Sequence, residues 1–424
     1  MQTLVQALNI LFILALSWWV WKHEATTEMR KFFWPALAAK FSAGILVGIL
    51  YGIFYTSSDT FFFFDSAVEI SQDARADFAG YINFLFSQSD AYFSGEDRTI
   101  FFIKITSIFT LLTFNNYWIC SLYFSLFSFL AAWKLTRFVW LKIPDLGIPA
   151  ATAFLFFPSC VFWASGILKE SLAMTALFYL TTVFLQIWLK QKISMIHLVW
   201  TAVAIWVTWN LKYYYIGLFI PVIVATLASR RIIEALRIKG FFRECTVMIL
   251  ILFFSVVTIS FAHPNFSFQR VAQVLVSNHD AILQASNPDD VVHFYNLSAT
   301  WLSIAANSPW ALFSGLFRPF IWEANTFLKI VVSVENVTLL VLSILSIKSL
   351  SKIKNSSYRL PILAVLVYCL VLCVFLTLST PNFGTLVRLR IGFLPFLILL
   401  LVNQPVIVRP LAKLFNVPQS GLSR

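Results

Sequence analysis

Five basic residues stand in short polar connections between long apolar segments of the chain. They are Lys169, Lys212, Arg318, Arg388 and Arg390. Lysine and arginine head groups bind phosphate and carboxylate, and arginine does so through two parallel hydrogen bonds. On the topology argued below, all five lie on the outer side, where basic residues are disfavoured. Charge kept at a membrane face against this rule indicates function. The pattern therefore predicts a site that faces outward and binds an anionic, lipid-linked substrate.

Two carboxylates open the first outer segment and are candidates for a catalytic base. Asp59 directly follows an apolar segment, and Asp65 lies after the aromatic run 61–64. A carboxylate held against aromatic walls at a membrane face can have a raised pKa and accept a proton from a reacting group. The alternative for Asp59 is a helix N-cap, a position that aspartate favours.

Two outer hairpins carry the next candidates. Lys169 and Glu170 end the segment 158–170, where they form either a solvated turn or a phosphate site at a helix N-terminus. Lys212 and Tyr213 lie in the second hairpin, where an aromatic residue and a lysine are either interfacial anchors or phosphate contacts.

The C-terminal third holds three of the five cations. Arg318 is followed by Pro319 and, five positions on, by Glu323, so it serves either an anion or an internal ion pair that fixes a bend. Arg388 and Arg390 follow the turn 381–385, in which Asn382 and its neighbours can expose backbone N–H groups to an anion.

Composition places the chain among membrane proteins. It is 59% hydrophobic and 12% charged, values that no water-soluble fold of 424 residues would show. The net charge of +12 is spread over loops without a basic domain, which argues against nucleic-acid binding. The five cysteines lie in or beside apolar segments, so a disulfide framework is not expected.

A bilayer core requires about 20 apolar residues per helix. The sequence predicts eleven spans, at 3–21, 32–54, 117–135, 146–166, 171–189, 195–210, 214–228, 246–262, 327–347, 360–379 and 390–404. With the N-terminus outside and the C-terminus in the cytoplasm, 20 of the 31 basic residues fall inside, 10 fall outside, and Lys40 lies within a span. The predicted location is the cytoplasmic membrane, with the active site facing the periplasm or exterior.

The predicted fold is an all-α membrane protein, a single polytopic domain over residues 1–424. Two long extracytoplasmic loops, 55–116 and 263–326, are expected to carry helices that lie along the membrane. In the first loop the apolar stretch 100–114 is interpreted as such a helix, because counting it as a span would put the basic cluster at 134–142 outside.

No cofactor is required by any motif. The chain has no Walker A loop, no Gly-x-Gly-x-x-Gly and no His-Glu-x-x-His. No metal-ligand spacing is found, although His279 and His293 share a loop with three aspartates, so a weak divalent-cation site there stays open. Without a nucleotide-binding element, the activated substrate is expected to arrive attached to lipid.

The plan of the chain resembles the C-type superfamily of polytopic membrane glycosyltransferases. The residues that carry the resemblance are an acidic first outer loop (Ser58-Asp59-Thr60) and a later hairpin ending in Lys169-Glu170. The likeness covers roughly residues 32–230. The segments 316–324 and 382–388 are similar to uncharacterised bacterial membrane proteins linked to surface polysaccharides. The chain departs from well-known members by an extra N-terminal span and by lacking a soluble C-terminal domain.

The resemblance implies an inverting transfer of sugar from a polyprenyl-phosphate donor to a glycan, lipid or protein acceptor at the outer face. Asp59 would be the base, with Asp65 second, and the five cations would hold the phosphate. A polysaccharide polymerase or ligase, using polyprenyl-diphosphate glycans, is the first alternative. A transporter is the second, but Lys40 and Glu335 are the only clear ionisable residues within spans, and no inverted repeat is found.

Overall fold

The computed structural model describes residues 1–53, 59–86, 96–262, 267–354 and 356–416. These residues form helices, and within them the only strand-like pairing is a bridge between Val291 and Asn382. The chain divides into two compact units. Unit 1 comprises Met1–Ile216 and Ala412–Arg424, and unit 2 comprises Gly217–Leu411. The single domain expected from the sequence stays a prediction.

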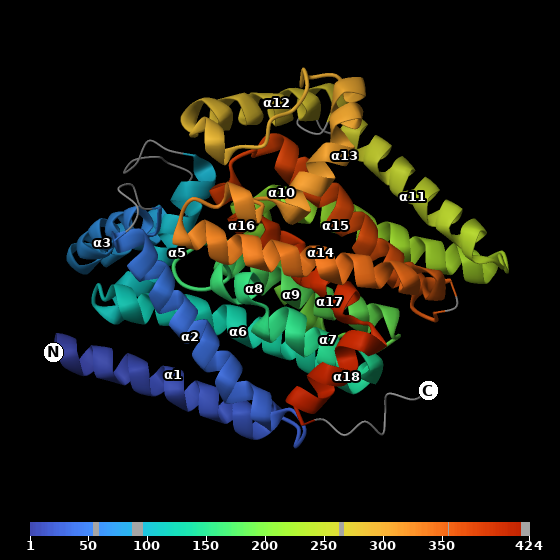
Figure 1. Ribbon diagram of the computed structural model, residues 1–424. Helices are drawn as coiled ribbons and strands as arrows, with labels where there is room; N and C mark the ends of the chain where they lie inside the picture. Colours follow the sequence, from blue (N-terminus) through green and yellow to red (C-terminus); the bar gives the residue numbers. More distant parts are fainter. Residues whose placement is uncertain (54–58, 87–95, 263–266, 355, 417–424) are drawn as a thin grey trace. The chain divides into compact units, whose positions relative to one another are not determined.

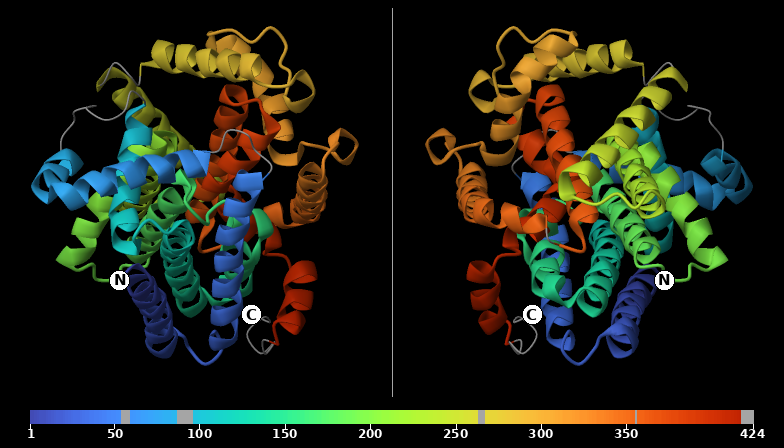
Figure 2. Two further views of the ribbon diagram at one scale, coloured as in Figure 1. Left: turned by 90° about the vertical axis from the view of Figure 1, so that its left-hand side faces the viewer. Right: turned by 90° about the vertical axis from the view of Figure 1, so that its right-hand side faces the viewer.

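Unit 1 is built around one buried helix. Its helices are α1 (Gln2–Glu24), α2 (Arg30–Ile53), α3 (Asp59–Ala76), α4 (Phe78–Phe86), α5 (Asp97–Thr113), α6 (Tyr117–Lys142), α7 (Gly147–Ala151), α8 (Pro158–Phe162), α9 (Lys169–Trp188) and the first part of α10 (Met195–Ala235). Helix α6 packs against α2, α5 and α9. Within its most apolar window 72% of α6 is buried, against 22% for α1, so α6 forms the core and α1 the periphery. Figures 1 and 2 show α1 and α2 joined as a hairpin of helices.

Close contact between α2 and α6 depends on small residues. Gly44 and Gly48 lie one turn apart on α2, where a Cβ on Gly48 would come within 2.6 Å of the Tyr117 ring. Ser121 of α6 donates to the Gly44 carbonyl oxygen at 3.0 Å. Small residues allow helix backbones to approach closely in a bilayer, where apolar burial alone does not drive association.

Lys40 lies one turn before Gly44 on the same face of α2 and is 2% exposed. Its ammonium group donates to Ser128 Oγ at 3.0 Å, to the Ala164 carbonyl at 3.0 Å and to the Val161 carbonyl at 3.4 Å. The two carbonyls belong to the end of α8 and the turn that follows it. An N–H donor there satisfies carbonyl groups that a helix end leaves without partners. Lys40 therefore joins α2 and α6 to the segment that leads into α9.

We expect Lys40→Met to destabilise the protein by at least about 1–3 kcal/mol, the cost of leaving a buried acceptor without a donor. The measurement is the free energy of unfolding of the purified protein in mixed detergent. Lys31→Met is the matched control, because Lys31 is exposed on the same helix. Equal stability of the two variants would contradict a structural role for Lys40.

Unit 2 contains the rest of α10 and the helices α11 (Phe241–Ala262), α12 (Phe268–Ala285), α13 (Trp301–Phe317), α14 (Phe327–Ile353), α15 (Arg359–Ser379), α16 (Phe383–Leu389), α17 (Leu394–Val402) and most of α18 (Pro405–Leu414). Helix α15 packs against α12, α13 and α17. Helix α12 lies across the end of α15 in Figure 2. A core of Leu275, Ile304, Ala311 and Leu378 joins α12, α13 and α15.

Eight helices within the described residues are long and apolar enough to cross a bilayer, and a pair bent by 70°, Phe383–Gly392 and Leu394–Val402, makes nine if it is one span. The predicted membrane character is confirmed, and the count of eleven is not. The predicted span 146–166 is a series of short pieces, including α7, the π-helical turn Thr152–Phe156 and α8. The predicted spans 195–210 and 214–228 lie in one 41-residue helix, α10, interrupted at Lys212.

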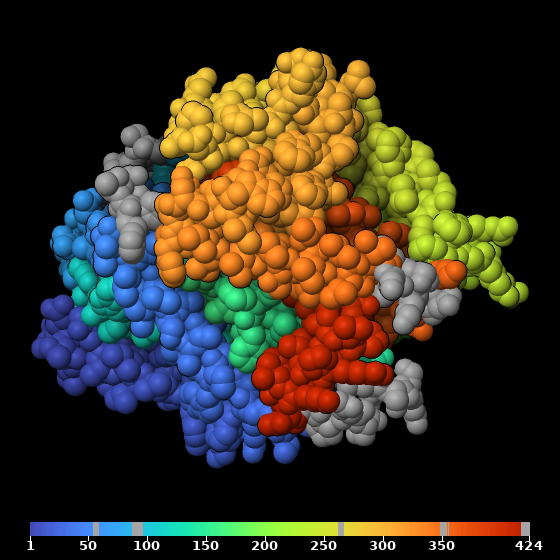
Figure 3. Space-filling view, viewed as in Figure 1, coloured from blue at the N-terminus to red at the C-terminus, as the bar shows by residue number. Residues whose placement is uncertain are grey.

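Within the described residues, the segments 55–116 and 263–326 contain helices. Nearly all of the stretch 100–114 lies in α5, which packs against α3, and the second segment contains α12 and α13. Their position along a membrane, and on its outer side, stays a prediction. Other helices also expose apolar surfaces suited to lipid: α1 exposes Leu8, Leu11 and Trp18, and α14 exposes Val331 and Val334. Both helices lie at the surface of their own units in Figure 3.

Candidate functional site

The polar cluster at the N-terminus of α9 is the candidate site in unit 1. Lys169 and Glu170 are the first two residues of α9. The chain reaches them through a turn at Gly166, whose φ of +73° is a left-handed conformation that suits glycine. The N–H of Gly166 donates to Ser125 Oγ of α6 at 3.0 Å. The turn is thereby tied to the core helix, so the start of α9 is fixed in place.

Lys212 reaches the same place from α10. Its backbone (φ −146°, ψ 67°) is not helical and interrupts the helix. The Lys212 ammonium lies 2.8 Å from a carboxylate oxygen of Glu170. Glu170 is 2% exposed and Lys212 is 8% exposed. The two hairpins predicted from the sequence therefore meet through a buried ion pair, and Glu170 pairs with Lys212 rather than forming a solvated turn.

Lys169 is held by α3 and α5. Its ammonium donates to Thr99 Oγ1 at 2.8 Å and lies 4.8 Å from the centre of the Phe63 ring. Arg98, next to Thr99, lies over the Tyr213 ring at 5.3 Å and pairs with Glu96 at 3.1 Å. The charges that act on Lys169 are Lys212, Glu170, Glu96 and Arg98. The cluster thus holds three cations and two carboxylates, which leaves a net positive charge beside a helix N-terminus.

Sequence reasoning missed Arg98, Thr99 and Phe63. The run Glu96-Asp97-Arg98-Thr99 directly precedes the apolar stretch of α5, and its density of charge at a helix start was the available signal. Phe63 carried no such signal, since it is one of four consecutive phenylalanines.

Asp59 and Asp65 lie on different faces of α3. Asp59 is the first residue of the helix and is exposed; residues 54–58 before it lie outside the described residues, so the capping interpretation stays a prediction. Asp59 precedes Phe63 by one turn, so it lies on the face of α3 that carries the Lys169 contact. Asp65 is turned about 200° from Phe63 around the helix. Burial raises the pKa of Asp65, and the nearby carboxylate of Glu69 raises it further. Asp59 is therefore the better placed carboxylate.

In unit 2 Arg318 forms the internal ion pair that was the alternative to an anion site. Its Nε lies 3.0 Å from one oxygen of Glu323, and a second guanidinium nitrogen also contacts the carboxylate. The other Glu323 oxygen accepts the Phe320 N–H at 2.8 Å. The guanidinium also lies 4.8 Å from the centre of the Phe383 ring. This half-buried ion pair, joined by more than one hydrogen bond, fixes the connection between α13 and α14.

Arg390 and Arg388 have different surroundings although they are two positions apart. Arg390 is fully buried, and its Nη1 donates to Asn336 Oδ1 at 2.9 Å and to the Leu316 carbonyl at 3.1 Å. It therefore stabilises the C-terminal end of α13, where carbonyl groups lack helical partners. Arg388 is half-buried on α16. Asn382 is the N-cap of α16, with its side chain accepting from the Thr385 N–H at 3.1 Å.

The structure thus brings together Lys169 and Lys212, with Glu170 and Tyr213, in unit 1. Arg318, Arg388 and Arg390, with Glu323 and Asn382, belong to unit 2. A cavity shared by cations of both units stays a prediction.

Among the described residues, no three His, Cys, Asp or Glu side chains form a group that could hold a metal ion. His279 is buried, and its Nδ1 lies 3.0 Å from the Leu378 carbonyl oxygen. Burial is the main cause that lowers the pKa of His279. It therefore serves the contact between α12 and α15, and the divalent-cation site left open by the sequence stays a prediction.

The helices and their apolar surfaces define an all-helical, multi-pass membrane protein. No protein-family model, curated protein or solved structure matches the chain. Its function must therefore be argued from the site itself.

Proposed function

We propose that the protein is a membrane glycosyltransferase of the C-type plan, which transfers a sugar from a polyprenyl-phosphate donor to an acceptor hydroxyl at the extracytoplasmic face. The observation that carries the proposal is the cluster of Lys169, Lys212 and Arg98, assembled from α9, α10 and α5. Three cations gathered at a span end suit a ligand whose reacting group is a phosphate.

The proposed reaction is a single displacement. Asp59 takes the proton of the acceptor hydroxyl, and the oxygen attacks the anomeric carbon of the sugar. The bond from that carbon to the phosphate oxygen breaks, and its electron pair leaves with the polyprenyl phosphate. Because one displacement occurs, the anomeric configuration inverts. Cations fixed beside the leaving phosphate stabilise the charge that develops on it.

The side-chain contacts of the basic residues decide which of them we assign to the phosphate. Lys169 is positioned by Thr99 and Phe63, and Lys212 is positioned by Glu170, so neither ammonium must reorganise when phosphate binds. Arg390 is left out of the proposed site because its side chain is fully buried. Arg318 and Arg388 lie in unit 2, and their phosphate-binding roles stay predictions from the sequence.

Lipid-linked intermediates in a deletion strain test the function. Loss of the protein should leave envelope glycans that lack one sugar, with the corresponding polyprenyl-phosphate sugar accumulating in mass spectra of the lipid fraction. Accumulation of long repeat units on polyprenyl diphosphate would instead indicate a polymerase or ligase. Unchanged glycans and lipids, together with sugar or lipid transport by the protein in liposomes, would indicate a transporter.

The pH dependence of transfer distinguishes the two candidate bases. A base must be deprotonated, so the rate falls as pH drops through its pKa. Glu69→Gln removes a charge that raises the pKa of Asp65. If Asp65 is the base, the fall of the transfer rate at acid pH should therefore move to lower pH in this variant. If Asp59 is the base, we expect the transfer rate of Glu69→Gln to fall at the same acid pH as that of the unmodified protein. Glu69→Asp, which keeps the charge, is the control, and a downward shift seen only in Glu69→Gln would assign the base to Asp65.

A further inference from the structure

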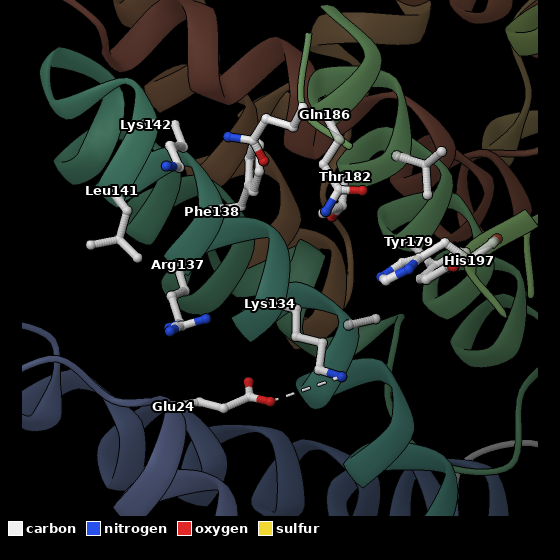
Figure 4. Close-up of a pocket in the computed structure, with 13 residues that line it drawn as sticks. Glu24, Lys134, Arg137, Phe138, Leu141, Lys142, Tyr179, Thr182, Gln186 and His197 are labelled. Carbon is white, nitrogen blue, oxygen red and sulfur yellow. Dashed lines mark hydrogen bonds and ion pairs between the residues drawn. The ribbon is translucent and has the colours of Figure 1, made fainter. Parts of the chain in front are cut away.

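A cavity of about 450 Å³ lies in unit 1 between the C-terminal half of α6 and the C-terminal half of α9. Figure 4 shows Arg137 and Lys142 on α6, with Tyr179 and Thr182 of α9 opposite them. Glu24, at the end of α1, closes one side. The cavity uses none of the residues of the proposed active site.

The cavity is rich in cations. Lys134, Arg137 and Lys142 line it, against the single carboxylate of Glu24. Lys134 lies 4.0 Å from Glu24, too far for a hydrogen bond, and 59% of its side chain is exposed. Arg137 Nε is buried and has no hydrogen-bond partner among the described residues. A buried N–H donor without an acceptor is costly unless a ligand or water supplies one.

The position of the cavity separates it from the first cluster. Lys169 begins α9, and Thr182 and Gln186, which line the cavity, lie near its end. At 1.5 Å per residue, the 17 positions from Lys169 to Gln186 span about 25 Å, close to the thickness of a bilayer core. The two basic sites therefore lie at opposite ends of the same apolar helix. On the predicted topology the cavity faces the cytoplasm.

We propose that this cavity binds the phosphate group of an anionic ligand, either a lipid headgroup of the nearby leaflet or a soluble phosphate compound. Arg137 is the central donor because its side chain lines the cavity, and Lys134 and Lys142 supply further charge. Basic pockets between spans on the cytoplasmic side suit phosphate headgroups. The cavity is large enough for one such group, and the side-chain amide of Gln186 can add a neutral donor. The inference does not rest on the proposed glycosyl transfer.

Binding is tested on the full chain purified in a neutral detergent. Native mass spectrometry measures retained phosphatidylglycerol, with phosphatidylcholine as the comparison lipid, and thermal unfolding is measured with added inorganic phosphate. We expect Lys134→Gln/Arg137→Gln to lower the affinity for the anionic probe at least tenfold. Arg231→Gln/Lys239→Gln, which removes two exposed charges outside the cavity, should bind as the unmodified protein does.

Each outcome bears on the proposal. Retention of phosphatidylglycerol alone identifies a lipid headgroup as the ligand, and stabilisation by inorganic phosphate identifies a free phosphate site. No response to either probe, or equal weakening in the cavity and control variants, would overturn the site. The melting temperature without ligand shows whether the cavity variant is folded. If it is not, Lys142→Gln, an exposed position, replaces it, and full affinity in that variant counts against the site.

Discussion

Asp59→Asn is expected to lower the rate of glycosyl transfer by about 10²–10⁴-fold, the usual contribution of a positioned general base. Asparagine has nearly the same shape as aspartate, and the side chain is exposed, so folding should be preserved. Asp59 is exposed at the first position of α3, one turn before the phenylalanine that lies against Lys169. The measurement is transfer from a polyprenyl-phosphate sugar in proteoliposomes, with the melting temperature measured in parallel.

Asp73→Asn is the matched control, since Asp73 is an exposed aspartate on the same helix and the substitution removes the same charge. It should transfer sugar at the unmodified rate. Full activity in Asp59→Asn would remove this residue from the mechanism. If Asp65→Asn were inactive at the same time, the base would be Asp65.

Lys212→Met is expected to lower both the stability and the activity of the protein. Glu170 is 2% exposed, and the substitution removes the ammonium 2.8 Å from its carboxylate. Removing one partner of a buried ion pair costs about 3–5 kcal/mol. The loss should fall near the lower end of this range, because Lys169 also acts on Glu170. Loss of one cation at the leaving phosphate should lower transfer by about 10²–10³-fold, as for other donors to developing charge.

Glu170→Gln/Lys212→Met separates the two effects. It removes both charges, so no carboxylate remains buried without its partner, and most of the lost stability should return. Transfer should stay low, because the cation is still missing. The free energy of unfolding and the transfer rate are measured for both single variants and for the double variant. Recovery of activity together with stability would show that Lys212 only supports the fold.

The sequence alone determined the class of the protein and most of its long helices. Lipid cannot satisfy backbone polar groups, so a span must be a continuous apolar helix, and this requirement is visible as composition. The apolar composition of these segments correctly predicted seven apolar helices: α1, α2, α6, α9, α11, α14 and α15. The sequence also singled out Lys169, Glu170 and Lys212 one by one, because charge at the end of an apolar segment is conspicuous.

Only the tertiary structure decided which of these charges meet. Lys169 contacts Thr99, 70 positions earlier, and Arg390 contacts Asn336, 54 positions earlier, and no local pattern encodes such pairs. Arg388 and Arg390 both lie between apolar residues, yet one is half-buried and the other is fully buried. The broken segment at 146–166 was predicted as a regular span because its composition is apolar throughout. Its break depends on contacts that composition cannot show, since packing against α6 and the Lys40 ammonium satisfies backbone groups that a regular helix would satisfy itself.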